Sequence, residues 1–161
     1  MTDIVRIDGS FGRWDELLAL ILSSFAYMDD VINPPSSAYR LTLASLAQKA
    51  IGEIAFVATE ENRLVGCMFL KPEAECLYVG KLAVAPGQQG KGVGRRLLAI
   101  AENTAHSLNL STLRLETRVE LVGNHTTFGR WGFQKTAEKS HPGFDRVTFI
   151  EMRKTLETLP V

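Results

Sequence analysis

This 161-residue sequence has little cysteine, no long apolar run and no excess of either charge. Its two cysteines, Cys67 and Cys76, have no C-x-x-C partner and no nearby histidine cluster, so we expect two reduced core residues and no metal. Lysine and arginine number 18, as do aspartate and glutamate, so no basic field attracts nucleic acid. The longest apolar run, Leu17–Leu22, is far shorter than the roughly 20 residues that span a bilayer, so no membrane is expected to be involved.

The N-terminus and the composition predict one cytoplasmic domain. Met1–Ile4 has an acid where a secretory leader has a basic region, and no long apolar run follows it, so no leader is expected. With 45% hydrophobic and 22% charged residues, the composition is that of an ordinary globular protein. The length fits a single domain over residues 1–161 that buries a core without disulfides.

Apolar periodicity predicts an α/β (α+β) fold. Apolar residues at helical spacing predict helices over 13–25, 42–51 and 95–108, and a further short helix ending at Trp131. Between Ala26 and Tyr39, turn-forming residues predict a surface loop with no regular element, long enough to act as a lid. Apolar or alternating runs predict strands over 4–7, 54–58, 64–70, 76–84, 112–117, 133–138 and 147–154.

The connections between these elements predict a mixed sheet. Three consecutive strands between 54 and 84 are joined by short turns, which indicates an antiparallel meander. The helix over 95–108 then separates two strands, and such a crossover implies parallel pairing. Helices are therefore expected on the faces of a mixed sheet.

The segment Pro86–Arg96 has the composition of an anion site. It joins a strand to the long helix, and its glycines let the backbone approach a ligand closely. The amides at a helix N-terminus carry partial positive charge. Arg95 and Arg96 stand in the first turn, where the helix dipole disfavours cations, and a bound polyanion would remove that conflict.

The segment matches neither of two common nucleotide-binding motifs, and the possibility that it binds no ligand stays open. A P-loop would need glycine where Ala85 stands and a hydroxyl residue where Gly92 stands. A dinucleotide motif meets Arg95 or Leu97 where its last glycine belongs. The remaining alternative is a glycine-rich turn that binds nothing.

The residues around the loop resemble the GNAT acetyltransferase superfamily. Leu82–Pro86 followed by Gln89–Gly94 is similar to the family's acyl-CoA motif, in which a glutamine or arginine precedes two glycines. Phe128–Phe133 resembles the later Tyr-x-x-x-Gly-Phe element, and Glu151–Lys154 resembles the closing strand. The resemblance covers about residues 54–154. It implies a mostly antiparallel sheet of six to seven strands, about four helices, and splayed central strands that form the acyl-CoA cleft.

The resemblance also implies that an acceptor amine attacks the thioester of acetyl-CoA directly. The amides of Gln89–Gly94 would bind the pyrophosphate, with Lys91, Arg95 or Arg96 near the phosphates. Pantetheine would lie along the backbone of Leu82–Val84, whose last amide can polarise the thioester carbonyl. The acetyl-CoA site implied in this way consists of Leu82, Ala83, Val84, Gln89, Gly90, Lys91, Gly92, Val93, Gly94, Arg95, Asn124 and Phe128.

Two departures from the family pattern leave the catalytic groups open. Phe128 stands where many members have a tyrosine that protonates the departing thiolate, and Tyr78 stands where some members have a carboxylate base. Tyr78 and His141 are the catalytic candidates, and Glu75 is a third candidate base. Each can also be explained without a catalytic role: Tyr78 as a strand aromatic, His141 as a solvated loop residue and Glu75 as an exposed strand end.

Other residues keep two readings. Asn124 either binds the pantetheine arm or caps a helix. Asp29 and Asp30 either receive a cationic amine or are solvated, and Trp131 is expected in the core or an interface.

The function predicted is therefore N-acetyl transfer from acetyl-CoA to a primary amine of a small-molecule or amino-acid-like acceptor. The alternative is an acyl-CoA-binding sensor or interaction module without catalysis. The expected partner is the amine acceptor, and the oligomeric state, a homodimer included, stays open.

Overall fold

Alternating side chains divide the apolar residues between the two faces of a seven-stranded sheet in the computed structural model, which describes residues 2–157. The strands are β1 (Thr2–Arg6), β2 (Ile54–Glu60), β3 (Arg63–Pro72), β4 (Leu77–Val84), β5 (Thr112–Arg118), β6 (Gln134–Lys139) and β7 (Phe149–Thr155). The helices are α1 (Trp14–Phe25), α2 (Leu43–Gly52), α3 (Val93–Ser107) and α4 (Val122–Arg130), with 3₁₀ helices η1 (Ala26–Met28) and η2 (Ser37–Arg40). The predicted element order and fold class are confirmed.

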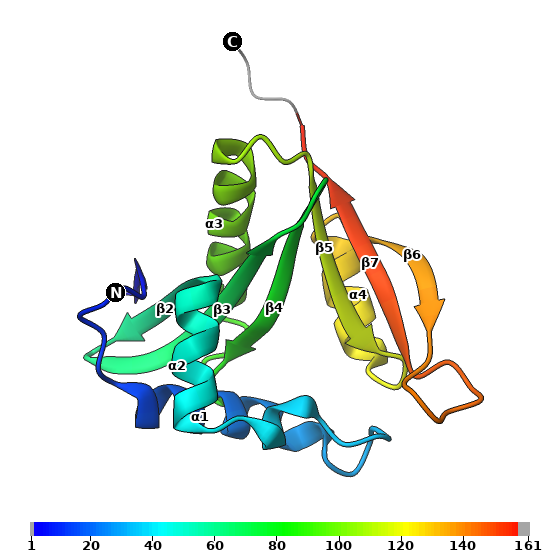
Figure 1. Cartoon of the computed structure of the whole chain (residues 1–161), viewed down its shortest axis with the longest axis horizontal. Coiled ribbons are helices and arrows are strands. Elements are labelled where there is room, and N and C mark those ends of the chain that lie inside the picture. Colours follow the sequence, from blue (N-terminus) through cyan, green and yellow to red (C-terminus); the bar gives the residue numbers. More distant parts are fainter. Residues whose placement is uncertain (1, 158–161) are drawn as a thin grey trace.

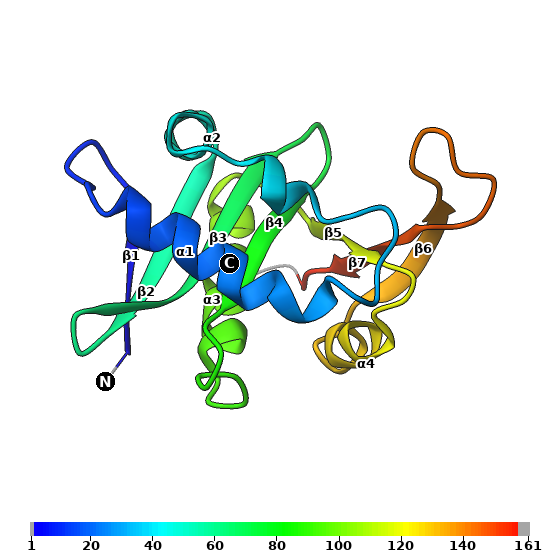
Figure 2. The same ribbon diagram turned by 90° about the horizontal axis from the view of Figure 1, so that it is seen from below.

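The two faces carry separate cores. On β3, Cys67 and Phe69 belong to a cluster formed with α1 and α2, whereas Met68 and Leu70 belong to a cluster formed with α3. Phe128 of α4 packs against the same cluster as α3. The sheet therefore lies between two helical layers, α1 with α2 and α3 with α4 (Figures 1 and 2).

The strand order is β1-β2-β3-β4-β5-β7-β6, and within residues 2–157 only β4 and β5 pair in parallel, as the crossover predicted. That parallel pairing stops after Leu77–Leu113 and Tyr78–Arg114. Beyond these pairs the two strands diverge, as Figure 1 shows. The implied splay of the central strands is present in this protein.

A β-bulge in β4 lies where the splay begins. Gly80 pairs with Phe69 and Ala83 with Cys67, so β4 carries one residue more than β3 across this interval. Lys81, inside the bulge, has a φ of 47°, a left-handed conformation that is uncommon for a residue other than glycine. Because a bulge bends its strand and increases the local twist, the end of β4 turns away from β5.

The segment between α1 and α2 is more ordered than its composition predicted. The expectation of no regular element is wrong, since the segment contains η1 and η2. Ser36 caps η2 by accepting a hydrogen bond from the amide of Ala38 at 3.2 Å. Met28 and Ile32 are buried and pack against Leu121, the residue before α4. Sparse apolar anchors, which no periodicity reveals, hold this segment against the connection between β5 and α4.

Glycines determine where α3 begins and where α4 ends. Helix α3 begins at Val93, two residues before the predicted start at Arg95, because Gly92 adopts the left-handed conformation directly before it. Helix α4 ends in the predicted Schellman pattern, with Gly132 at φ 97° and the amide of Phe133 donating to Phe128 O at 3.0 Å.

Candidate active site

The loop before α3 presents backbone donors without acceptors. The amide of Gln88 donates to Ala85 O, and that of Arg96 donates to Gly92 O at 3.0 Å. Every amide from Gln89 to Arg95, between these two, lacks a hydrogen-bond acceptor within residues 2–157. An uninterrupted run of free N–H groups at a helix N-terminus is a binding site for an anion with several oxygens.

Glycine makes this run of donors accessible. Gly90 and Gly92 have φ values of 80° and 85°, a region that other residues rarely adopt. A Cβ at either position would meet nothing within 4 Å, so the space beside the backbone is open. A Cβ on Gly94, in contrast, would lie 3.2 Å from the Trp131 ring, which shows how closely α3 and α4 approach here.

The edge of β4 beyond the bulge supplies further backbone groups. Ala85 donates its amide to Val65 O of β3 at 2.8 Å. Because N–H and C=O groups alternate sides along a strand, those of Val84 point away from β3, toward the gap left by β5. The Gln89 side chain accordingly donates to Val84 O from the loop, at 3.5 Å.

These groups border a cavity of about 580 Å³, which we call the cofactor cavity. Of the predicted acetyl-CoA site, all residues but Lys91 line this cavity. Arg96 points elsewhere, because its guanidinium donates to Thr2 O at 2.7 Å, so Arg95 is the arginine of the pair that faces the cavity. The residues that the sequence did not identify are Ser24, Phe25, Tyr27, Gln88, Thr127 and Trp131.

Two side-chain amides in this cavity suit a polar ligand. Gln88 Oε1 is buried without a hydrogen-bond partner in the described chain. Asn124 Nδ2 donates to the Tyr27 hydroxyl at 3.4 Å. The capping reading of Asn124 is wrong, because the residue at the N-cap of α4 is Leu121 and has no side-chain cap. Asn124 instead lies in the first turn of α4 and lines both cavities.

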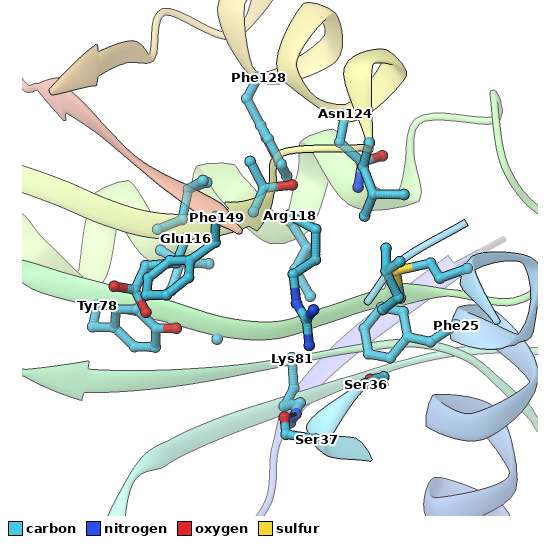
Figure 3. A pocket seen from close by; sticks show the side chains of 18 of the residues that line it. Phe25, Ser36, Ser37, Tyr78, Lys81, Glu116, Arg118, Asn124, Phe128 and Phe149 are labelled. Carbon is cyan, nitrogen blue, oxygen red and sulfur yellow. Dashed lines mark hydrogen bonds between the residues drawn. The ribbon is translucent and has the colours of Figure 1, made fainter. Parts of the chain in front are cut away.

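The second cavity, of about 280 Å³, lies on the other side of the splay and is called the acceptor cavity (Figure 3). It is lined by side chains from η2, β4, β5, β7 and the loop between β6 and β7. Both predicted catalytic candidates, Tyr78 and His141, line it. Leu82, Asn124, Phe128 and Phe25 line both cavities, so the two meet beside the end of β4.

Tyr78 is held at one end of the acceptor cavity with its hydroxyl protonated. The Arg114 guanidinium lies 4.5 Å from the centre of the Tyr78 ring. Burial, together with the nearby Glu116 carboxylate, raises the pKa of Tyr78 to about 12. Near neutral pH the Tyr78 hydroxyl is therefore a hydrogen-bond donor and a poor base.

The pKa of His141 is shifted in the opposite direction from that of Tyr78. Burial lowers the pKa of His141, and the positive charge of Arg118 adds to the effect, so the ring is neutral at pH 7. Its Nδ1 lies 2.5 Å from Thr148 Oγ1, and its ring packs 4.8 Å from that of Phe149. When Nδ1 donates to Thr148, Nε2 keeps a lone pair that can take a proton.

Charged side chains that the sequence did not identify line the same cavity. Glu116 is the only acidic lining residue in the described part of the chain, and Glu116 Oε2 is occupied by Arg114 at 3.2 Å and Lys139 at 3.3 Å. Lys81 and Arg118 face the cavity from β4 and β5 (Figure 3). Their residue types are unremarkable in strands, and only the bulge and the splay bring them together.

Three acids considered as candidates lie outside both cavities. Glu75 is exposed between β3 and β4. Asp29 and Asp30 are exposed as well, and Asp29 accepts a hydrogen bond from the Tyr39 hydroxyl. The solvated reading fits these two aspartates.

The remaining features add no second site. Cys67 and Cys76 are free and buried, as expected, and burial raises the pKa of Cys67 to about 12. No group of three or more potential metal ligands is found in the part of the chain that the structure describes. Nor does any helix within residues 2–157 have the length and apolar character needed to cross a membrane.

Comparison with known proteins identifies the family. The model of the acetyltransferase (GNAT) family matches residues 14–133. A protein named IAA acetyltransferase from Azospirillum brasilense is 32% identical over 121 residues, which cover 74% of this chain and 77% of that protein. A GNAT acetyltransferase structure from Staphylococcus aureus Mu50 has a TM-score of 0.76 at 17% identity, over 98% of this chain and all of that one. Another from Elizabethkingia anophelis, with acetyl-CoA bound, has a TM-score of 0.68 at 19% identity, covering 96% and 98%. The chain therefore belongs to the GNAT family of acetyltransferases.

Proposed function

We propose that this protein transfers an acetyl group from acetyl-CoA to a primary amine of a small, amino-acid-like acceptor. The observation that carries the proposal is the meeting of the two cavities at Leu82, Asn124 and Phe128. One cavity offers the free amides of an anion site, and the other offers titratable side chains. A thioester and an amine bound in these cavities would meet beside the end of β4.

The residues of the cofactor cavity fit acetyl-CoA. The free amides of Gln89–Arg95 are suited to the pyrophosphate, with the Arg95 side chain nearby. Asn124 and the unpartnered Gln88 Oε1 can hydrogen-bond the amides of pantetheine. The Val84 N–H, which points away from β3, is placed to polarise a carbonyl.

When bound, acetyl-CoA supplies a thioester carbon that bonds to the amine nitrogen as the carbon–sulfur bond breaks and the CoA sulfur leaves as thiolate. His141, neutral at pH 7, takes the proton that the amine loses. The Tyr78 hydroxyl, protonated near neutral pH, is a further hydrogen-bond donor in the same cavity. The Phe128 ring packs against those of Trp131 and Phe133, whose centres lie 5.8 and 5.9 Å from its own, and gives both cavities an apolar wall.

A screen that measures CoA release in the presence of many amines tests the proposal. Binding of acetyl-CoA is measured in parallel by calorimetry. Release of CoA that depends on an added amine supports an N-acetyltransferase. Tight binding of acetyl-CoA with no CoA release for any amine would overturn the proposal and leave a sensor or interaction module.

A further inference from the structure

The acceptor cavity contains more positive than negative charge. Arg40, Lys81 and Arg118 line it, and among residues 2–157 none of these three has a carboxylate within 4 Å. Glu116, the one acid among the lining residues that the structure describes, is already paired with Arg114 and Lys139, which are not lining residues. The cavity is therefore positively charged where it meets the segment between α1 and α2.

Neutral groups hold the two half-buried cations in place. Lys81 Nζ donates to Ser37 Oγ at 2.9 Å. Arg118 Nη1 donates to Pro34 O at 2.6 Å, and Nη2 donates to Pro35 O at 3.0 Å. These bonds orient the side chains but do not neutralise them, and Arg118 feels the Glu120 carboxylate only from beyond salt-bridge distance, which is unfavourable for partly buried cations. Burial, followed by the charges of Lys49, Arg118 and Arg40, lowers the pKa of Lys81 accordingly.

Donor groups remain free for a ligand. An ammonium has three N–H groups and a guanidinium has five, so Lys81 and Arg118 retain donors beyond their bonds to the loop. Figure 3 shows Arg118 extending toward Lys81 across the cavity, on the side away from Tyr78 and Glu116. Thr117, which is 7% exposed and lines the same cavity, has a buried hydroxyl with no hydrogen-bond partner in the described chain.

This arrangement also disfavours some acceptors. A free amine in water carries a positive charge, and a purely cationic molecule would be repelled by three cations that form no salt bridge. A molecule that bears both an amine and a carboxylate has no such net repulsion. The cavity, at about 280 Å³, lies just below the usual range for drug-sized ligands, which suits a molecule of amino-acid size.

We propose that the acceptor is an amine that also bears a carboxylate, and that Lys81 and Arg118 bind this carboxylate while the amine lies toward Tyr78 and His141. The inference rests on the proposed function, because it assumes that this cavity receives the acceptor. It assigns specificity to two residues that take no part in the transfer itself. Arg40, exposed at the end of η2, adds to the attraction from the rim.

The test compares matched acceptors in the CoA-release assay. Each standard L-amino acid and β-alanine is assayed beside its carboxamide and beside the amine that lacks the carboxyl group. For the accepted amino acids, we expect kcat/KM to exceed that of the carboxamide by at least about 100-fold, because charge-assisted hydrogen bonds are lost with the charge. Equal rates for acid and carboxamide, or a preference for carboxyl-free polyamines, would overturn the inference.

Variants then assign the preference to residues. Lys81→Met and Arg118→Met should each reduce the ratio of kcat/KM for the acid to kcat/KM for the carboxamide to below about 10. The kcat/KM for the carboxamide and the KM for acetyl-CoA should change little. Lys81→Arg should retain part of the preference. The matched control is Lys71→Met, at an exposed residue of β3 that lines neither cavity, and it should keep the full ratio. An unchanged ratio in both folded test variants would contradict the assignment.

A binding measurement separates this inference from the proposed function. Calorimetric titration of the same amino acids into the CoA-saturated protein requires no turnover. Binding that is lost in Lys81→Met, without CoA release in any assay, would mean that the inference holds and that the proposed catalysis fails. CoA release that is indifferent to the carboxylate would mean the reverse.

Discussion

The cofactor cavity and the acceptor cavity lie on either side of the end of β4, but their polar groups come from different parts of the residues. The cofactor cavity takes its polar groups largely from the backbone of one continuous stretch, Gln89–Arg95, and from the edge of β4. The acceptor cavity takes them from the side chains of Lys81 on β4, of Glu116 and Arg118 on β5, and of His141 in the loop between β6 and β7.

This difference determines what each side can recognise and how it can change. Backbone amides bind phosphate oxygens whatever side chains surround them, provided that glycine keeps the loop open. Side chains define one particular acceptor, and a single substitution alters charge or proton transfer. We therefore expect changes on the two sides to separate cleanly in kinetics, with acetyl-CoA affected by one set and the acceptor by the other.

The largest effect is expected for Gly92→Asp, on the cofactor side. It places a side chain and a negative charge beside the free amides, in a residue with a φ of 85°. Loss of about two charge-assisted hydrogen bonds predicts that the Kd for acetyl-CoA rises about 10³-fold. Calorimetry on the folded variant measures this rise, and an unchanged Kd would contradict the assignment of the loop.

Gly87→Asp is the matched control for this change. Gly87 has a φ of 88°, its Cβ would also meet nothing within 4 Å, and it does not line the cofactor cavity. The control carries the same strain and the same charge in the same loop. We expect it to lower the melting temperature about as much as Gly92→Asp does, while acetyl-CoA binds with nearly the original Kd.

The same contrast explains how much the sequence could predict. Gly90, Gly92 and Gly94 alternate within one short segment, so their spacing indicates an anion site directly. Lys81 and Arg118 give no such signal, because their meeting depends on a bulge at a non-glycine residue and on the divergence of two strands. The predicted element order was right, whereas Asn124 was ambiguous because capping depends on the turn at which a helix begins.

The second prediction concerns a change in the acceptor cavity alone. If His141 is the base, His141→Gln should lower kcat about 100-fold with the KM for acetyl-CoA unchanged. Its lowered pKa means that the neutral, active form is lost only as the pH falls below about 6.5. Because the acceptor amine must also be deprotonated, log kcat/KM should fall with a slope of about two at low pH in the native protein, and about one in the variant.

His106→Gln is the control for this pH profile, since His106 lies on α3 and lines neither cavity. It should leave both the rate and the slope at low pH unchanged. A slope of about two that persists in His141→Gln would exclude His141 as the base and turn attention to Glu116.

A smaller effect is expected for Tyr78→Phe. The ring and its contact with Arg114 are kept, and only the hydroxyl is removed. Because that hydroxyl has a pKa of about 12, it stays protonated over the usual assay range and acts as a donor. The expected result is a fall in kcat of about tenfold, with the shape of the pH profile preserved. Loss of an ionisation from the profile would instead make Tyr78 a titrating base.

The smallest effect is expected at Phe128, which lines both cavities and occupies the tyrosine position of the Tyr-x-x-x-Gly-Phe element that residues 128–133 resemble. The phenylalanine ring contacts Trp131 and Phe133, so a tyrosine ring should pack in the same place and add only a hydroxyl. The departing CoA thiol resembles a cysteine thiol, whose pKa is about 8.5, so it leaves readily as thiolate and needs little help from an acid.

Phe128→Tyr should therefore change kcat by less than about tenfold, a shift in the barrier of under about 1.4 kcal/mol. Steady-state kinetics with saturating acceptor measures it, and Phe128→Leu serves as a control for ring packing without a hydroxyl. A rise of about a hundredfold would mean that protonation of the thiolate limits the native enzyme and that its site lacks an acid. An unchanged rate, together with the tenfold loss in Tyr78→Phe, would place the useful hydroxyl on the acceptor side, where the titratable side chains already lie.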